Sequence, residues 1–161
     1  MRHAKAEAVA ASDHDRRLTA RGVRDAAEAG AWARSAGILP DHVFVSTAAR
    51  ADETWSAFSD AADLDLTPDL DAGLYSAGPD AAMEVLRAAP TEARTVMIVG
   101  HNPTMAQLVH LLDGGGADPD AFAAITADFP TSAVAVLEVP GEWADLEIGC
   151  ARIADAHVGR G

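Results

Sequence analysis

Cysteine, aromatic side chains, basic residues and long apolar runs are all scarce in this chain of 161 residues. Its single cysteine, Cys150, cannot form an internal disulfide, which is typical of proteins in a reducing cytoplasm. No apolar run approaches the roughly 20 residues of a membrane span, and no secretory signal peptide heads the sequence. We therefore expect a cytoplasmic protein that does not span a membrane.

The shortage of basic residues produces a net charge of −13, from 12 Lys and Arg against 25 Asp and Glu. Nucleic-acid backbones and anionic lipid surfaces both attract basic protein surfaces. The charge balance therefore argues against nucleic acid and membranes as partners. A site for an anionic substrate would have to gather several arginines against a repulsive background.

Aromatic residues make up only 5% of the chain, so Val, Leu, Ile and Ala must supply most of the core. The hydrophobic share of 49% and the charged share of 23% are ordinary for globular proteins. No repeat, low-complexity tract or Pro/Gly/Ser-rich linker divides the sequence. Residues 1–161 are expected to form one domain.

Helical patterns alternate with short apolar runs. The spacing predicts a helix over residues 19–35, with Thr19 as its N-cap and Gly37 as its stop. Further helices are predicted over residues 49–62, over residues 80–89 with Asp80 as the cap, and over residues 104–115. The runs 42–48 and 94–100 are predicted to be buried parallel strands, and 131–140 and 143–155 a hairpin that turns at 140–142.

This alternation of helices and strands indicates an α/β domain with a mostly parallel sheet. Ligands of such sheets bind beyond the carboxyl ends of the strands. Two segments fall at that edge, residues 46–50 and residues 100–104. We expect the functional site there.

Four separated segments carry arginine or histidine at predicted loops or strand ends: Arg2 with His3, Arg16, Arg50 and His101. Arginine forks bind phosphate oxygens bidentately, and a neutral imidazole can attack phosphorus to form a covalent phosphohistidine. The remaining groups can stabilise charge in the transition state. The sequence contains neither a Walker glycine loop nor a cluster of metal ligands, so we expect phosphoryl chemistry without a metal or cofactor.

Three motifs, RHA near the start, STAARADET after one strand and VGHNP after the next, resemble the histidine phosphatase superfamily. The segments RHAKAEA, SDHDRRLTARG, GLYSAG and TSAVAVLEV are similar to its small SixA-like group of phosphohistidine phosphatases. The resemblance spans nearly the whole chain. It implies a three-layer α/β/α sandwich with a mostly parallel central sheet, the fold of the phosphoglycerate mutases.

The resemblance also implies roles for single residues. His3 would be the nucleophile and Arg2 its phosphate-binding neighbour. Arg50, in AARADET, would join the phosphate clamp, and His101 would donate to the phosphoryl oxygens from the opposite side. Arg16 matches an arginine that small members bring from the loop before the first helix.

The general acid is left open by the resemblance, because this compact chain lacks the inserted glutamate of larger members. That gap favours phosphohistidine, whose P–N bond is labile and whose imidazole leaves readily. Asp13 is a candidate for an auxiliary acid or a water-positioning group; alternatively, it pairs with Arg16 to order the loop. Arg17 stands where a proline is common and is expected to face solvent.

Two histidines are expected to differ in charge. His3 must be neutral to attack phosphorus, and neighbouring arginines should lower its pKa because like charges disfavour the imidazolium. His101 is expected to be charged, since it would face a dianion.

These observations predict a phosphohistidine phosphatase that acts on the phosphorylated histidine of a protein or on a small phosphorylated substrate. Two alternatives remain open. One is a phosphatase of a small phosphate ester or nucleotide. The other is a catalytically silent member that only binds phosphoproteins or anions.

In the resembled family, a buried apolar strand precedes the Arg-His pair and lies centrally in the sheet, but here only Met1 stands before Arg2. A central strand contributes several buried apolar side chains, each worth roughly 1.5–3 kcal/mol. We therefore expect the first central strand to be truncated and the biological chain to begin upstream. The 161-residue chain should then be unstable or weakly active.

Overall fold

Three parallel strands form the centre of the fold. In the computed structural model, which describes residues 1–117, 119–126 and 129–161, β1 (His42–Ser46) lies between β2 (Asp69–Asp71) and β3 (Val96–Val99). Both pairings are parallel. Because side chains alternate along a strand, Val43 and Val45 enter one apolar cluster and Phe44 enters another. Both faces of β1 are therefore buried.

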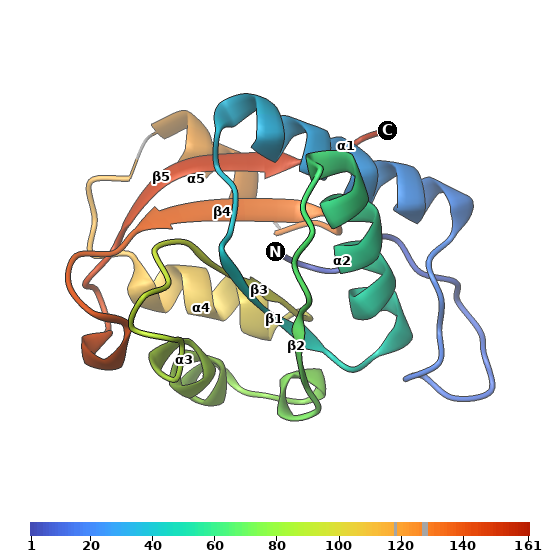
Figure 1. Ribbon diagram of the computed structural model, residues 1–161, viewed down its shortest axis with the longest axis horizontal. Helices are drawn as coiled ribbons and strands as arrows, with labels where there is room; N and C mark the ends of the chain where they lie inside the picture. Colours follow the sequence, from blue (N-terminus) through green and yellow to red (C-terminus); the bar gives the residue numbers. More distant parts are fainter. Residues whose placement is uncertain (118, 127–128) are drawn as a thin grey trace.

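Helices cover the two faces of this sheet (Figure 1). The first apolar cluster joins it to α1 (Ala20–Ala36) and α2 (Ala49–Ala62), and the second joins it to α3 (Pro79–Arg87) and α4 (Thr104–Leu112). The expected three-layer α/β/α sandwich with a parallel central sheet is confirmed.

The ends of α1 follow the predicted signals, but those of α3 do not. Thr19 caps α1 by accepting a hydrogen bond from the Gly22 N–H, and Gly37 ends it with a φ of 70°, which suits glycine. The prediction of Asp80 as the cap of α3 is wrong. Gly78 is the N-cap and Pro79 the first helical residue, a position where the fixed φ of proline fits and its missing N–H costs nothing.

The late strands pair antiparallel as predicted, but the prediction of a tight turn between them is wrong. β4 (Ala133–Glu138) pairs with β5 (Arg152–Val158), and residues 139–151 connect them through the short helix η2 (Trp143–Asp145). The Trp143 indole donates a hydrogen bond to the Ala93 carbonyl, at 2.7 Å. Trp143, expected at the start of the second late strand, thus packs against another part of the fold and does not pair with β4. α5 (Pro119–Thr126), which contacts β5, and the short strand β2 were not predicted.

The first three residues join the two sheets. Arg2 pairs parallel with Gly100 just after β3, and its N–H donates to the Ala133 carbonyl of β4, at 3.0 Å. The Met1 ammonium donates to the Ile98 carbonyl, at 2.7 Å. Burial lowers the pKa of this ammonium group to about 5.

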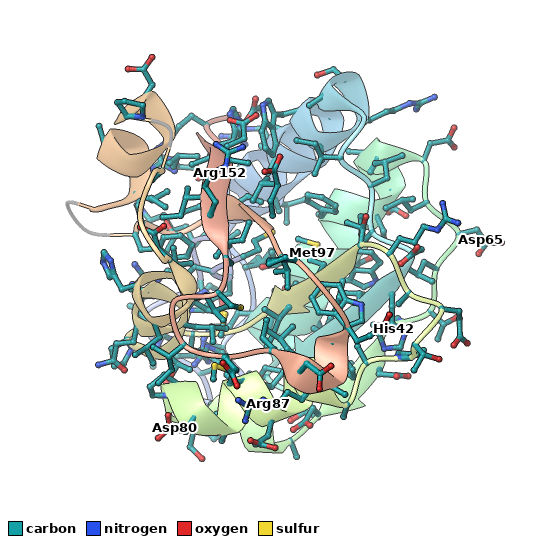
Figure 2. The ribbon with its side chains drawn as sticks, turned by 90° about the vertical axis from the view of Figure 1, so that its left-hand side faces the viewer. His42, Asp65, Asp80, Arg87, Met97 and Arg152 are labelled. Carbon is teal, nitrogen blue, oxygen red and sulfur yellow. The ribbon has the colours of Figure 1, made fainter. Side chains whose placement is uncertain are left out.

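A groove of about 700 Å³ lies between β3 and β4, and Met1 is one of the residues that line it. Its apolar lining includes side chains from both strands: Val96, Met97, Ile98, Val134, Ala135, Val136 and Leu137. Figure 2 looks onto this side of the molecule and labels Met97 near the centre of the view. Within the described ranges, no helix has the length and apolarity needed to cross a membrane.

Candidate active site

His3 lies at the carboxyl end of the sheet, where it is the last of the three residues that join β3 to β4. Its Nδ1 is 2.7 Å from the Ala4 carbonyl oxygen. Because a carbonyl oxygen can only accept, Nδ1 carries the hydrogen, and Nε2 of the neutral ring keeps its lone pair. Burial, with the charges of Arg50, Arg2 and Arg16, lowers the pKa of His3 to about 4, although the hydrogen bond to Ala4 opposes this shift. His3 is thus neutral at pH 7, with Nε2 as the free nucleophilic atom.

His101 faces His3, with 5.0 Å between the ring centroids. Its Nε2 lies 2.9 Å from the Ser46 hydroxyl oxygen, and its buried Nδ1 has no hydrogen-bond partner among the described residues. Burial, followed by the charges of His3 and Arg50, lowers the pKa of His101 to about 3. In the unliganded site, desolvation therefore keeps His101 neutral, unlike the charged state expected for it beside a bound dianion.

Arg50 lies in the first turn of α2, just after β1, and only 6% of it is exposed. Its Nη1 donates to the main-chain carbonyl of Asp13 at 2.7 Å, and its Nη2 to the Asp13 carboxylate at 3.1 Å. Its buried Nε has no partner within the described parts of the chain. The Nε–H of this guanidinium is therefore a donor that the described residues leave unpaired.

Asp13 connects three side chains of the site. Its carboxylate accepts hydrogen bonds from the Tyr75 hydroxyl at 2.7 Å, from Arg16 at 2.8 Å and from Arg50. The hydrogen bonds from Tyr75 and Arg16, followed by the charge of Arg50, hold the pKa of Asp13 well below its usual range. Asp13 is ionised at neutral pH, so the structure argues against the expected role of auxiliary acid. The pairing with Arg16 considered above is observed.

Arg2 and Arg16 complete the group around His3. The Arg2 guanidinium donates to the Phe129 carbonyl at 3.0 Å, and the Arg16 Nε donates to the Glu7 carbonyl at 2.6 Å. Both charges contribute to the lowered pKa of His3. The structure thus brings together all six side chains that the sequence singled out.

Arg17 lies outside this group, as expected. Its side chain is 74% exposed and pairs with Glu53. Glu53 also accepts a hydrogen bond from the Leu18 N–H at 2.7 Å, so it attaches the loop to α2.

Three further residues reach the site that the sequence reasoning did not single out: Ser46, His14 and Tyr75. Tyr75, the only tyrosine of the sequence, contacts the His101 ring edge-on, with 5.7 Å between the ring centroids. The His14 and Tyr75 ring centroids are 5.0 Å apart. His14 also lies 3.1 Å from the Thr47 hydroxyl. Tyr75 and His14 lie in the segments GLYSAG and SDHDRR. The periodicity of a sequence does not indicate which loops lie side by side in the fold. Among the described residues, no cluster of three or more His, Cys, Asp or Glu could hold a metal ion.

The model of the histidine phosphatase superfamily (branch 1) matches residues 1–75. A solved SixA protein from Nakamurella multipartitia, whose proposed activity is that of a phosphohistidine phosphatase, is 36% identical. The similarity covers 99% of this chain and 93% of that one, with a TM-score of 0.84. This chain belongs to the histidine phosphatase superfamily. Its similarity to SixA proteins extends over the whole fold, and the chain is a phosphatase.

Further relatives and solved structures are similar to this chain over nearly its whole length. A SixA protein from Agrobacterium tumefaciens is 32% identical with a TM-score of 0.77, over 98% of this chain and 94% of that one. An uncharacterized protein of Mycobacterium leprae (strain TN) is 39% identical over 99% of this chain and 100% of its own length. A SixA complexed with tungstate shares the fold, with 24% identity and a TM-score of 0.80, over 98% and 94% of the two chains.

Proposed function

We propose that this histidine phosphatase hydrolyses phosphohistidine, through a covalent phosphoryl intermediate on His3. The names of its SixA relatives support phosphohistidine as the substrate class. The protonation state of Asp13 carries the choice between phosphohistidine and a phosphate ester.

The first chemical step uses the lone pair on Nε2 of His3. This atom attacks phosphorus, a new N–P bond forms, and the P–N bond of the substrate breaks. The departing ring carries a proton on its other nitrogen and leaves as neutral imidazole. Burial of His3 keeps its ring unprotonated, and the hydrogen bond to Ala4 directs Nε2 rather than Nδ1 at the substrate.

In the second step, water attacks phosphorus, the N–P bond to His3 breaks and inorganic phosphate leaves. Buried N–H groups can stabilise the charge on the phosphoryl oxygens in both steps. The Arg50 Nε–H is such a group, since it has no partner among the described residues, and His101 lies beside His3. Arg2 and Arg16 add positive charge, which such a site requires in a protein with a net charge of −13.

The leaving group decides the substrate class. An alkyl phosphate ester releases an alkoxide, which needs a proton from an acid in the site. Asp13 is the carboxylate bound to Arg50, and it is held in its ionised form by Tyr75 and Arg16. A site whose carboxylate cannot give a proton suits imidazole, which leaves without that help.

Rapid-quench mass spectrometry tests this proposal. The protein is mixed with a phosphohistidine-containing peptide, with an aryl phosphate and with an alkyl phosphate, and acid-labile phosphate on His3 is measured. We expect a phosphorylated His3, loss of turnover in His3→Ala, and little change in His110→Ala, an exposed histidine of α4. Faster turnover of the alkyl phosphate than of phosphohistidine would overturn the substrate class, and no phosphate on His3 would overturn the mechanism.

A further inference from the structure

Ser46 is a buried polar residue to which neither the motifs nor the proposed reaction assigns a role. It is the last residue of β1 and is 0% exposed. β1 and β3 are neighbouring parallel strands with Val45 opposite Val99, so Ser46 and His101 leave the sheet at the same edge. The Ser46 hydroxyl oxygen lies 2.9 Å from Nε2 of His101.

A second contact of the Ser46 hydroxyl bears on the direction of this hydrogen bond. The Ala48 N–H donates to the Ser46 hydroxyl oxygen, at 3.4 Å. The hydroxyl oxygen keeps a second lone pair, so this contact is compatible with either direction; where the hydroxyl gives its own hydrogen, the Nε2 lone pair of His101 accepts it. A neutral imidazole carries one hydrogen, which must then be on Nδ1.

The other side of the His101 ring supports this assignment. Nδ1 is buried and has no hydrogen-bond partner in the described part of the chain, while the His3 ring lies 5.0 Å from the His101 ring. An N–H at this position would donate to an oxygen of a phosphoryl group held at His3. In the other tautomer, the Nδ1 lone pair would face that anionic oxygen and repel it.

We propose that Ser46 is a positioning residue: its hydroxyl donates to Nε2 of His101 and so places the ring hydrogen on Nδ1, where it donates to the phosphoryl group. The role of the phosphoryl group rests on the proposed function, whereas the tautomer does not. Ser46 thereby lets an uncharged histidine act as a donor to an anion, in a pocket where burial disfavours the charged ring.

Nitrogen NMR on the unliganded protein tests the tautomer without any substrate. Long-range ¹⁵N–¹H correlation spectra distinguish the two tautomers of a neutral histidine, and a His101→Gln variant identifies the His101 signals. We expect hydrogen on Nδ1 in the native protein and a mixture, or hydrogen on Nε2, in Ser46→Ala. Hydrogen on Nε2 in the native protein would overturn the proposal.

Kinetics on the same variants test the consequence. We expect Ser46→Ala to lower kcat by about 10-fold or more, as for loss of one aligned donor, and to weaken inhibition by inorganic phosphate. Ser46→Cys, which nearly keeps the volume but donates weakly, should behave like Ser46→Ala. The matched control is Ser59→Ala, because Ser59 is also a buried serine but lies on α2 and bonds to the Ser56 carbonyl.

The outcomes separate this inference from the proposed function. A loss of activity in Ser46→Ala with an unchanged His101 tautomer would show a merely structural role and overturn the inference, as would an unchanged kcat. If the native protein leaves phosphohistidine intact, the proposed function fails, and the NMR spectra still decide the tautomer. Thermal melting of each variant tests whether it is folded. If Ser46→Ala unfolds the protein, the tautomer and kcat are measured on Ser46→Cys instead.

Discussion

Arg50 holds Asp13 by two different groups of that residue, with one nitrogen on the main-chain carbonyl and another on the carboxylate. This double contact attaches the loop before α1 to the first turn of α2. The same carboxylate accepts hydrogen bonds from Arg16 and Tyr75. The loop and the arginines of the site therefore form one hydrogen-bonded unit, which the carboxylate of Asp13 holds together.

Arg50 and Arg17 provide a matched pair of substitutions. Arg50 is 6% exposed and lies beside His3, whereas Arg17 is exposed and pairs with Glu53 outside the site. We expect Arg50→Ala to lower kcat/KM by about 10²–10³, the cost of losing a preorganised donor, and Arg17→Ala to change it little. Steady-state rates on an aryl phosphate measure both. Equal, mild effects would show that Arg50 does not contact the phosphoryl group.

The pH dependence of kcat/KM should show an acid limb near pH 4. Activity requires a neutral His3, whose pKa burial and the neighbouring arginines lower to about 4. kcat/KM reports ionisations of the free enzyme, so it should stay nearly flat from pH 5 to 8 after correction for ionisation of the substrate. A limb near pH 6.5, the ordinary value for histidine, would show that His3 is more solvated than the structure describes. NMR titration of His3 provides the independent check.

The stability of this chain should rise with pH in the range where the Met1 amine loses its proton. Burial lowers the pKa of the amine from 8.0 to about 5 in the folded state, so between these values the unfolded chain binds a proton that the folded chain does not. The free energy of unfolding then increases by about 1 kcal/mol or more between pH 7 and 9, above the range where His3 and His101 titrate. Urea denaturation measures this increase.

An N-acetylated form of the chain is the control for that measurement. Acetylation removes the titrating amine, so the increase between pH 7 and 9 should disappear. An increase of the same size in the acetylated chain would place its origin in other groups.

The groove beside Met1 should accept an added strand. An engineered extension of about five β-branched apolar residues before Met1 would run parallel to β3 and antiparallel to β4, and its side chains would enter the apolar groove. Each well-buried side chain contributes roughly 1.5–3 kcal/mol before the cost of ordering the backbone. We expect the melting temperature to rise by several degrees, since about 1 kcal/mol corresponds to 2–4 °C at this size.

A Gly-Ser extension of equal length is the control for this experiment, since it offers backbone but no apolar side chains. If both extensions leave the melting temperature unchanged, the groove does not accept a strand. The expectation of an upstream central strand, stated above from the sequence, stays a prediction.

Much of the fold could be read locally. The helix α2 was predicted with the bounds that it has, and Thr19 and Gly37 mark the ends of α1, because caps and apolar spacing act within a few residues. β2 was missed because Asp69–Asp71 is short and acidic and becomes a strand only by pairing with β1. The second late strand begins at Arg152, later than the pattern predicts, because Trp143 does not join the hairpin and instead donates a hydrogen bond to the distant Ala93 carbonyl.

The sequence by itself determined which residue types are available for phosphoryl chemistry and the strand ends that carry them: His3, Arg50 and His101. Only the tertiary structure decided their protonation and partners. His101 is neutral because it is buried, Asp13 is ionised because Tyr75 and Arg16 donate to it, and Ser46 reaches His101 because two strands far apart in the chain end side by side. Residue identity is local, but the pKa of a group and the direction of a hydrogen bond depend on solvent exclusion and on charges that folding brings together.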